Sequence, residues 1–550
     1  MALNLVATTA RKSITADELV LIPAAYYNLV TDDFQLVREH PPACKLLAGI
    51  PLLFLQPQEP RPDSLGSLTR ADREWEYAMR FWQDNRAQFE AISFWSRVPM
   101  IALTVGLALL TFIFARDMFG SRAALFAVAL FALEPTMLAH GRVVQTDVVA
   151  AFGLLLTLFA LYRYWLAPNW KRAAVVGAAA GIAMLTKFSM IIVGPALLLV
   201  FIALLLFSRR RRSVGWHGLV AAVTLLLVVN AGYFFRHRAL GKEDTEWIAR
   251  SFPDYSTTVL ASVRALRFIL PTDFLIGLYW QLHHSNEGHP AGLLGMYSQR
   301  GWWYYFPVAF ALKTTIPFLL LSLASLGWAI YRVGFKRDWK LLFLLVPFLL
   351  YTVFVMMSPI DIGVRYYLPA FAFLFISSGA LLDSLLRKKL TRRTHLLLAS
   401  SVMLMLVWAG VEAIRAYPNY MPYMNQFASA RPHWWYLSDS NVEWGDDVKE
   451  LAEYLRSRGE TRTRALLLGG YVTLGFYGVE YVDALSPVEP SPPRYLALGA
   501  SFLNGSTVPG QEVNGRFVSE TERVNTFAEF RRRAPEAIIG DSIYVFRVDE

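Results

Sequence analysis

Two short segments of the sequence bring carboxylates to the edges of apolar blocks. Asp17 and Glu18 form an acidic pair just before an apolar run, and Glu134, Arg142 and Asp147 share the short stretch between two apolar blocks. Ionisable groups at a membrane boundary are costly and usually face a cavity or a partner. A carboxylate can take a proton from a hydroxyl nucleophile, so both segments could supply a general base. Thr15 or Asp17 could also cap the helix that follows, and the two roles are compatible.

Basic residues stand near the same boundaries. The segment 39–45 carries Glu39, His40 and Lys45 around two prolines, which fix an extended entry into the next apolar run. Three further cations lie at or just inside the ends of apolar blocks: Lys187, Lys313 and Arg365. One such residue alone commonly extends its charge to the membrane surface. Three on one face would form a pocket for an anion at membrane depth, such as a lipid phosphate.

The composition points to a membrane protein. Of the 550 residues, 55% are hydrophobic and 17% are charged, whereas soluble domains have about 25% charged residues. The net charge of +10 sits in short clusters between apolar blocks, so we expect no nucleic-acid partner. The apolar blocks predict ten membrane spans, near 98–115, 122–138, 148–166, 173–186, 188–207, 216–235, 305–331, 341–357, 366–386 and 395–414.

The distribution of lysine and arginine predicts the orientation of these spans, because short cytoplasmic loops are rich in basic residues. Five alternate loops carry two to five basic residues each, at 116–122, 167–172, 208–215, 332–340 and 387–394. The opposite short loops hold only Arg142, Lys187 and Arg365. The segments 13–97, 236–304 and 415–550 are therefore predicted to be extracytoplasmic, as are all the candidate residues.

We expect a mainly α polytopic membrane helix bundle with a small C-terminal extracytoplasmic α/β domain. Residues 1–97 would hold a truncated first helix and the first external catalytic loop, with 44–55 in the interface. Residues 98–414 would form the bundle, with a large external loop at 236–304. Residues 415–550 would form the soluble domain, with an amphipathic helix over 447–458 and strands at 464–468, 494–500 and 542–548.

Carboxylates and cations on one external face suit glycosyl transfer from a lipid phosphate. The carboxylate would activate the acceptor, and the cations would stabilise the departing phosphate. The sequence contains neither a P-loop nor a GxGxxG motif, so the donor would come from the membrane.

The chain resembles the protein O-mannosyltransferase family, glycosyltransferase family 39, and its bacterial phospholipid-carrier-dependent relatives in the C-type glycosyltransferase superfamily. The motifs that carry the resemblance follow one another along most of the chain: Asp17-Glu18, Glu39-His40-Pro41-Pro42-x-x-Lys45, Arg142-x-x-x-x-Asp147, Gly301-Trp-Trp-Tyr-Tyr-Phe-Pro307, Gly363-Val-Arg365-Tyr-Tyr-Leu-Pro369, Pro418-Asn-Tyr420 and Asp439-Ser-Asn-Val-Glu-Trp-Gly-Asp446.

The resemblance implies an inverting transfer on the extracytoplasmic face of the bacterial inner membrane. It implies Asp17 as catalytic base or metal-facing carboxylate, with Glu18 supporting it, and Asp147 as a residue that orients the acceptor or a metal. Arg142 would hold the carrier phosphate, and placement adds Lys187, Lys313 and Arg365. The donor would be a polyprenyl-phosphate sugar and the acceptor a protein, lipid or glycan. A divalent metal ion on Asp17 and Asp147 stays open, because relatives differ in metal dependence.

Two other functions remain as alternatives. A transporter or flippase of lipid-linked glycans would place polar groups near the middle of the membrane, often in two related halves. A non-catalytic scaffold would tolerate replacement of the loop carboxylates. The gathering of ionisable residues at one face favours the transferase over both.

Overall fold

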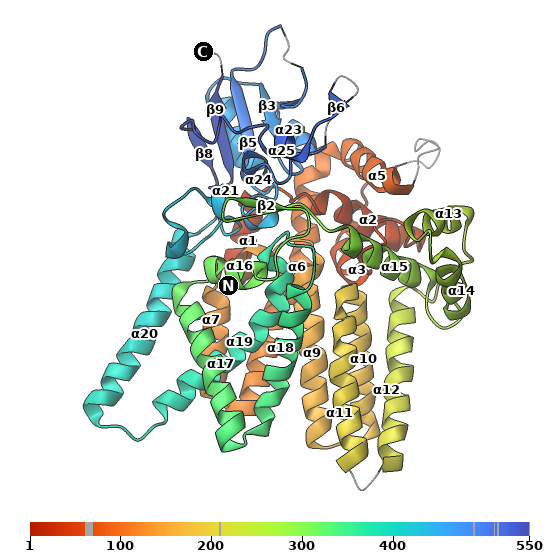
Figure 1. The fold of residues 1–550 in the computed structure, drawn as a ribbon, viewed down its shortest axis with the longest axis vertical. Coiled ribbons are helices and arrows are strands. Elements are labelled where there is room, and N and C mark those ends of the chain that lie inside the picture. Colours follow the sequence, from red (N-terminus) through yellow and green to blue (C-terminus); the bar gives the residue numbers. More distant parts are fainter. Residues whose placement is uncertain (61–69, 208–210, 488–489, 511, 514–515, 549–550) are drawn as a thin grey trace.

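The computed structural model describes residues 1–60, 70–207, 211–487, 490–510, 512–513 and 516–548. A bundle of apolar helices carries a small α/β domain on one end (Figure 1). We call this end of the bundle the domain end. The predicted basic loops lie at the opposite end, apart from residues 208–210, which are outside the described ranges.

Eight helical segments within the described ranges are long and apolar enough to cross a membrane. They contain α6 (Phe89–Phe119), α9 (Thr146–Leu166), η3 (Phe188–Ile192) with α11 (Val193–Phe207), α12 (Arg211–Gly232), α17 (Ile316–Lys336), η4 (Trp339–Leu341) with α18 (Leu342–Met356), η5 (Val364–Tyr367) with α19 (Leu368–Leu386), and α20 (Arg392–Arg415). Two shorter helices, α7 (Ser121–Leu133) and α10 (Trp170–Thr186), complete the bundle. The predicted multi-pass helical fold is confirmed.

Two predicted spans had wrong ends. The block 305–331 is broken into α16 (Tyr305–Lys313) and α17, because Thr314 is extended and Pro317 favours the start of a new helix. The block 122–138 is also broken, and α7 ends before Glu134. The residue before a proline disfavours helical geometry, so Pro135 opens a separate helix, α8 (Pro135–His140).

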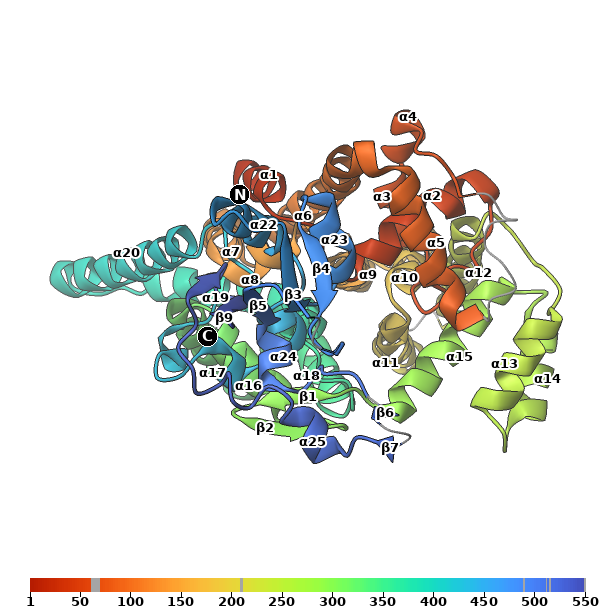
Figure 2. The same ribbon diagram turned by 90° about the horizontal axis from the view of Figure 1, so that it is seen from above.

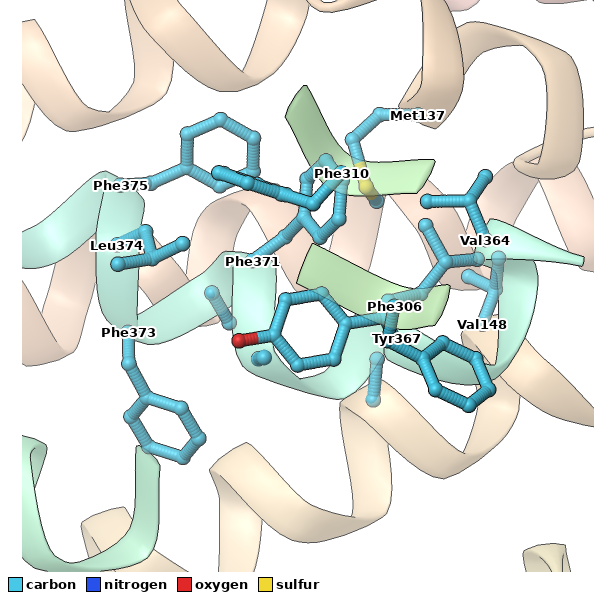
Figure 3. Packing of buried hydrophobic residues seen from close by; sticks show 14 of the residues in the cluster. Met137, Val148, Phe306, Phe310, Val364, Tyr367, Phe371, Phe373, Leu374 and Phe375 are labelled. Carbon is cyan, nitrogen blue, oxygen red and sulfur yellow. The ribbon is translucent and has the colours of Figure 1, made fainter. Parts of the chain in front are cut away.

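Helix α19 forms the centre of the bundle. It is apolar on all sides and almost wholly buried, as expected of a helix surrounded by other helices. Its phenylalanines pack against neighbouring rings (Figure 3): Phe371 lies 5.1 Å from Phe310, and Phe375 stacks on Phe318 at 4.4 Å between ring centroids. This packing fixes α19, which directly follows η5 with Arg365.

Short helices cover the domain end of the bundle. They are α1 (Ala2–Arg11), α2 (Glu18–Thr31), α3 (Ala43–Gly49), α4 (Leu52–Leu55), α5 (Arg70–Asp84), α13 (Lys242–Ser251), α14 (Ser256–Leu266) and α15 (Thr272–Glu287), with the hairpin β1 (Ala291–Leu293) and β2 (Met296–Ser298). The apolar run 44–55 does not span, since Pro51 separates α3 from α4. Seen from above, α13–α15 and α20 project on opposite sides (Figure 2).

The C-terminal domain is built on a five-stranded sheet of order β4-β3-β5-β9-β8. Strand β3 (Arg462–Leu466) runs parallel to β4 (Glu480–Asp483) and β5 (Tyr495–Gly499), while β9 (Ile543–Arg547) is antiparallel to β5 and to β8 (Ala537–Ile539). Helices α21 (His433–Tyr436), α22 (Val448–Ser457), α23 (Gly470–Phe476), α24 (Ala500–Asn504) and α25 (Glu520–Val524), with the hairpin β6 (Glu512–Val513) and β7 (Arg516–Phe517), complete the C-terminal segment. The predicted helix 447–458 and the three predicted strands coincide with α22, β3, β5 and β9.

Helices α10 and α12 pack with their backbones in close contact. A Cβ atom on Gly177 would lie 2.1 Å from the carbonyl oxygen of Ala221. Small residues allow such approach between membrane helices, where packing rather than the hydrophobic effect drives association. The helix pair therefore depends on the absence of a side chain at residue 177.

We predict that Gly177→Leu lowers the stability of the protein in detergent by about 1–3 kcal/mol or more, because the side chain forces the helices apart. Gly215→Leu, also in the α10–α12 pair but with no neighbour within 4 Å of its Cβ position, is the control. Thermal unfolding followed by size-exclusion chromatography measures both. Equal melting temperatures for the two variants would contradict the close packing.

Candidate active site

The segment before α2 is held against the C-terminal domain by its backbone. The amides of Ser13 and Ala16 donate to the carbonyl oxygens of Asp446 and Trp444, each at 2.8 Å. Lys12 adds an ion pair with Asp447. These contacts place Asp17, the residue before α2, beneath the C-terminal domain at the end of the bundle.

Glu18 is buried in an ion pair with Arg97 of α6. The guanidinium Nε donates to Oε1 at 2.7 Å and a terminal nitrogen donates to Oε2 at 2.5 Å. The backbone amides of Thr15 and Val144 donate to the same carboxylate at 2.8 and 2.9 Å. Glu18 thus joins three distant segments, and both carboxylate oxygens are engaged. Its place suits a residue that positions Asp17.

Arg365 joins Asp17 to Asp147. One terminal nitrogen of Arg365 lies 2.8 Å from Oδ2 of Asp17 and 3.5 Å from Oδ2 of Asp147. The guanidinium also lies 4.1 Å from the ring centroid of Trp444. The two carboxylates, 130 residues apart in the sequence, therefore meet at one cation, as the loop motifs predicted.

Lys187 completes this group. Its ammonium lies 2.5 Å from Oδ1 of Asp147 and 3.6 Å from the ring centroid of Tyr366. Among the described residues, Nε of Arg365 and Oδ2 of Asp147 are buried without a hydrogen-bond partner. Buried polar atoms are normally hydrogen-bonded, so an unpartnered pair marks a place where a ligand or water belongs. We call Asp17, Asp147, Lys187 and Arg365 the central cluster.

The loop 39–45 borders the central cluster. Burial lowers the pKa of His40 to about 4; Asp17 acts in the opposite sense, while Lys187, Lys45 and Arg365 lower it further. The imidazole is therefore neutral at pH 7 and close to the cluster. Lys45 donates to the carbonyl oxygens of Val37 and Leu36 at 2.8 and 3.2 Å, which fixes the path of the loop.

Arg142 and Lys313, which were predicted to bind the donor phosphate with Lys187 and Arg365, both contact the C-terminal segment. Arg142 is fully buried, and its guanidinium lies 2.7 Å from Asp446. The ammonium of Lys313 donates to the carbonyl oxygens of Met421 and Asn441 at 2.5 and 2.6 Å. Both residues therefore join the bundle to the C-terminal segment. Nε and one terminal nitrogen of Arg142 are buried without a hydrogen-bond partner among the described residues, so its role at a phosphate stays a prediction.

Trp444, Tyr366 and Asp439 belong to the site but were not predicted. Trp444 and Asp439 lie in the 439–446 motif, so their position in the sequence was noted without a role. Burial raises the pKa of Asp439; nearby His289 and Arg365 lower it, and Asp17 raises it. Asp439 also lines a pocket of about 670 Å³ that extends between the β1–β2 hairpin and the C-terminal domain.

The side chains of the central cluster do not form a metal site in this arrangement. No group of three His, Cys, Asp or Glu side chains within the described ranges could hold a metal ion. Asp17 and Asp147 instead share the guanidinium of Arg365. The positive charge at the cluster is supplied by Arg365 and Lys187.

Residues 89–234 match the family described as dolichyl-phosphate-mannose-protein mannosyltransferase. The matched segment contains Arg142, Asp147 and Lys187, and the match confirms the resemblance that the loop motifs predicted. The chain is thus similar to membrane glycosyltransferases that use lipid-linked donors. No curated protein matches the sequence.

Solved structures with similar folds cover most of the chain. ArnT from Cupriavidus metallidurans, bound to undecaprenyl phosphate, is 12% identical with a TM-score of 0.49, over 94% of this chain and 95% of that one. The oligosaccharyltransferase of Archaeoglobus fulgidus is 12% identical with a TM-score of 0.47, over 88% of this chain and 64% of that one. At these values neither structure indicates the activity of the present chain.

We predict that Glu18→Gln lowers the free energy of unfolding by about 3–5 kcal/mol, because it leaves the charge of Arg97 buried without an opposite charge. Glu90→Gln removes an exposed carboxylate that pairs with Lys449, and we expect it to cost at most about 1 kcal/mol. Thermal unfolding in detergent measures both variants. A similar loss in the two would mean that the Glu18–Arg97 pair has no special role in stability.

Proposed function

We propose that this chain is an inverting glycosyltransferase that moves a sugar from a polyprenyl phosphate to a protein, lipid or glycan acceptor on the extracytoplasmic face of the bacterial inner membrane. The observation that carries the proposal is the central cluster, where Asp17 and Asp147 meet Arg365 and Lys187 at the end of a membrane bundle. The family match over residues 89–234 supports the same class of reaction.

Asp17 is the residue that can act as catalytic base. Its side chain is 31% exposed, whereas those of Asp147, Arg365 and Lys187 are 2%, 8% and 10% exposed. Of the two carboxylates, only that of Asp17 is open to an acceptor. Its carboxylate takes the proton of the acceptor hydroxyl as the oxygen attacks the anomeric carbon, a role for which a positioned carboxylate is suited.

Lys187 and Arg365 are the residues that can stabilise the leaving phosphate. When the new bond to the anomeric carbon forms, the bond from that carbon to the phosphate oxygen breaks and negative charge develops on the phosphate. Fixed cations in a water-poor site stabilise such charge strongly. Asp147 binds both cations and so holds them in position before the donor arrives.

The pocket at Asp439 gives the acceptor a route to Asp17. It is lined by His289, Gln299 and Arg523 as well as Asp439, and Asp439 is close enough for the charge of Asp17 to affect its pKa. The route lies between the C-terminal domain and the β1–β2 hairpin. The C-terminal domain would therefore contribute to the choice of acceptor.

An apolar groove in the bundle suits the lipid tail of the donor. Its volume is about 310 Å³, and its walls come from α9, α11 and the segment of η4 and α18, with Leu161, Ala203 and Phe343 among the lining residues. Helix α9 begins at Thr146, next to Asp147, and η3, which leads into α11, begins just after Lys187. At 1.5 Å per residue, Leu161 lies about 21 Å along α9 from Asp147, so a tail of several isoprene units would reach it.

The basic loops support the proposed orientation. The ion pairs of Arg122 with Asp383 and of Arg332 with Asp338 lie at or next to helix ends opposite the domain end. Basic loops favour the cytoplasmic side, which leaves the central cluster outside. Ionisable residues gathered at one end, without a polar path through the bundle among the described spans, favour transfer over transport.

We predict that Asp17→Asn lowers kcat about 10²- to 10⁴-fold, because the amide cannot accept the acceptor's proton. Membrane insertion and melting temperature should stay unchanged. The assay incubates purified protein with a panel of polyprenyl-phosphate sugars and measures released polyprenyl phosphate by mass spectrometry.

The control for this experiment is Asp32→Asn, an exposed carboxylate that pairs with Arg236 at the far end of α2. Full turnover in Asp17→Asn would remove Asp17 from the mechanism. Movement of labelled lipid across liposomes with no glycosyl product from the wild type would instead establish a flippase.

We predict that Ala203→Trp, which fills the groove, raises KM for a long-chain polyprenyl-phosphate donor at least about tenfold and leaves KM for a two-isoprene donor unchanged. A tenfold rise in KM corresponds to a loss of about 1.4 kcal/mol in the free energy of donor binding. Leu198→Trp, on an exposed face of the same helix, is the control. Equal effects on long and short donors would contradict the assignment of the groove.

A further inference from the structure

A second pocket at the domain end lies on the side of α5, α13 and α15. Its volume is about 260 Å³, slightly below the usual range of about 300–1,000 Å³ for small-molecule sites. The residues that give it its chemistry are Glu39, Glu74, Trp247 and Trp280. We call it the Glu39–Glu74 pocket. Its size suits one small ring rather than an extended ligand.

The charges of the neighbouring walls neutralise one another. Arg38 lies 2.9 Å from Asp244, and Arg238 lies 2.5 Å from Asp244 and 2.7 Å from Asp273. Arg38 and Asp244 also line the pocket, and these ion pairs balance their charges. The charge that the pocket offers to a ligand therefore comes from the two glutamates.

Glu39 and Glu74 form no ion pair with any residue in the described ranges. Burial raises the pKa of Glu74 to about 8, and the charge of Glu39 raises it further. Burial raises the pKa of Glu39 as well, although Lys45 and Arg38 act in the opposite sense. Two carboxylates that share a buried pocket are stabilised by any ligand that donates hydrogen bonds to them.

Two tryptophans supply an apolar wall. Trp247 of α13 lies 6.0 Å from Phe252 and 6.4 Å from His283, and Trp280 of α15 lies 5.2 Å from His284, all between ring centroids. These contacts hold the indoles in place while they line the pocket. Flat aromatic faces pack against the C–H faces of a sugar ring, and carboxylates accept hydrogen bonds from its hydroxyls.

The Glu39–Glu74 pocket lies near the central cluster, because Glu39 and His40 are consecutive residues. Glu39 lines the pocket, while the next residue, His40, lies close enough to Asp17, Lys187 and Arg365 for their charges to act on its pKa. Asp17 also acts on Glu39. A ring bound in the pocket would be held beside the residue proposed to act as base.

We propose that the Glu39–Glu74 pocket binds a sugar ring without an acidic group, belonging either to the donor or to the acceptor of the transfer, and rejects acidic sugars. This inference rests on the proposed function for the identity of the ligand. The pKa of Glu74 is raised to about 8 by burial and by the charge of Glu39, so at pH 7 the pair carries the charge of Glu39. A uronate would bring a second negative charge to it, and like charges placed together cost several kcal/mol.

The first test measures binding without catalysis. Saturation-transfer NMR and calorimetry follow the purified protein with matched pairs of methyl glycosides: glucoside with glucuronide, and galactoside with galacturonide, together with mannoside and xyloside. We expect at least one neutral glycoside to bind saturably, and its acidic counterpart to bind at least about tenfold more weakly. Binding of none of them, or equal binding of a neutral and acidic pair, would overturn the proposal.

Variants assign the binding to this pocket. We expect Trp280→Ala to lower affinity for the neutral glycoside about tenfold or more, and the double variant Glu39→Gln, Glu74→Gln to remove the discrimination against the uronide. The matched controls are Trp170→Ala and Glu453→Gln, both exposed and distant from the pocket. Pocket variants that bind like the controls would overturn the assignment.

A kinetic test separates the donor from the acceptor as the source of the ring. Hydrolysis of polyprenyl-phosphate mannose in the absence of an acceptor gives KM for the donor alone. A higher donor KM in the pocket variants identifies the donor sugar, and an unchanged donor KM with weakened glycoside binding identifies the acceptor. The Asp17→Asn variant should still bind the glycoside. Glycoside binding by wild-type protein that shows no transferase activity would count against the proposed function alone.

Discussion

Glu18 and Arg97 bear opposite charges in a place that solvent does not reach, and the arrangement of the domain end follows from their pairing. An isolated charge in such a place costs several kcal/mol, so each residue requires the other. Arg97 also donates to the carbonyl oxygens of Lys12 and Ser13, and Glu18 accepts from the amide of Val144. The pair thus holds the segment before α2 and the loop before α9 against α6. Asp17 and Asp147 reach one guanidinium because these two segments are held together.

The central cluster contains one solvent-accessible side chain and three enclosed ones. Asp17 is the accessible carboxylate, and the three other members are held by each other and by the rings of Trp444 and Tyr366. Enclosed cations keep their geometry and their strength when a phosphate arrives, because little water has to be rearranged. The pockets at Asp439 and at Glu39 lie in different parts of the domain end, and the apolar groove lies deeper in the bundle. In the function proposed above, these are separate places for a base, a phosphate, a lipid tail and sugar rings.

The sequence predicted the helices well, because long apolar blocks can be satisfied only by spanning segments. It also predicted that Asp17, Asp147, Lys187 and Arg365 come together, since the pattern of basic loops puts all four on the same side of the membrane. It did not separate these residues from Arg142 and Lys313, which stand at the same depth but turn toward Asp446 and toward the carbonyl oxygens of Met421 and Asn441. Their partners lie in the C-terminal segment, and nothing local in the sequence gives that pairing. The Glu39–Glu74 pocket was missed for the same reason, as its walls come from four separate stretches of the chain.

The contacts of the C-terminal segment have a consequence for the order of synthesis. Arg142 enters the membrane 304 residues before its partner Asp446 is made, and Lys12 waits 435 residues for Asp447. At about 5–20 residues per second, the first interval lasts about 15 to 60 s. During that time the nascent bundle holds cations whose counterions do not yet exist, so its final packing has to wait for the last quarter of the polypeptide. Docking of the C-terminal domain is thus also the last step in the assembly of the bundle.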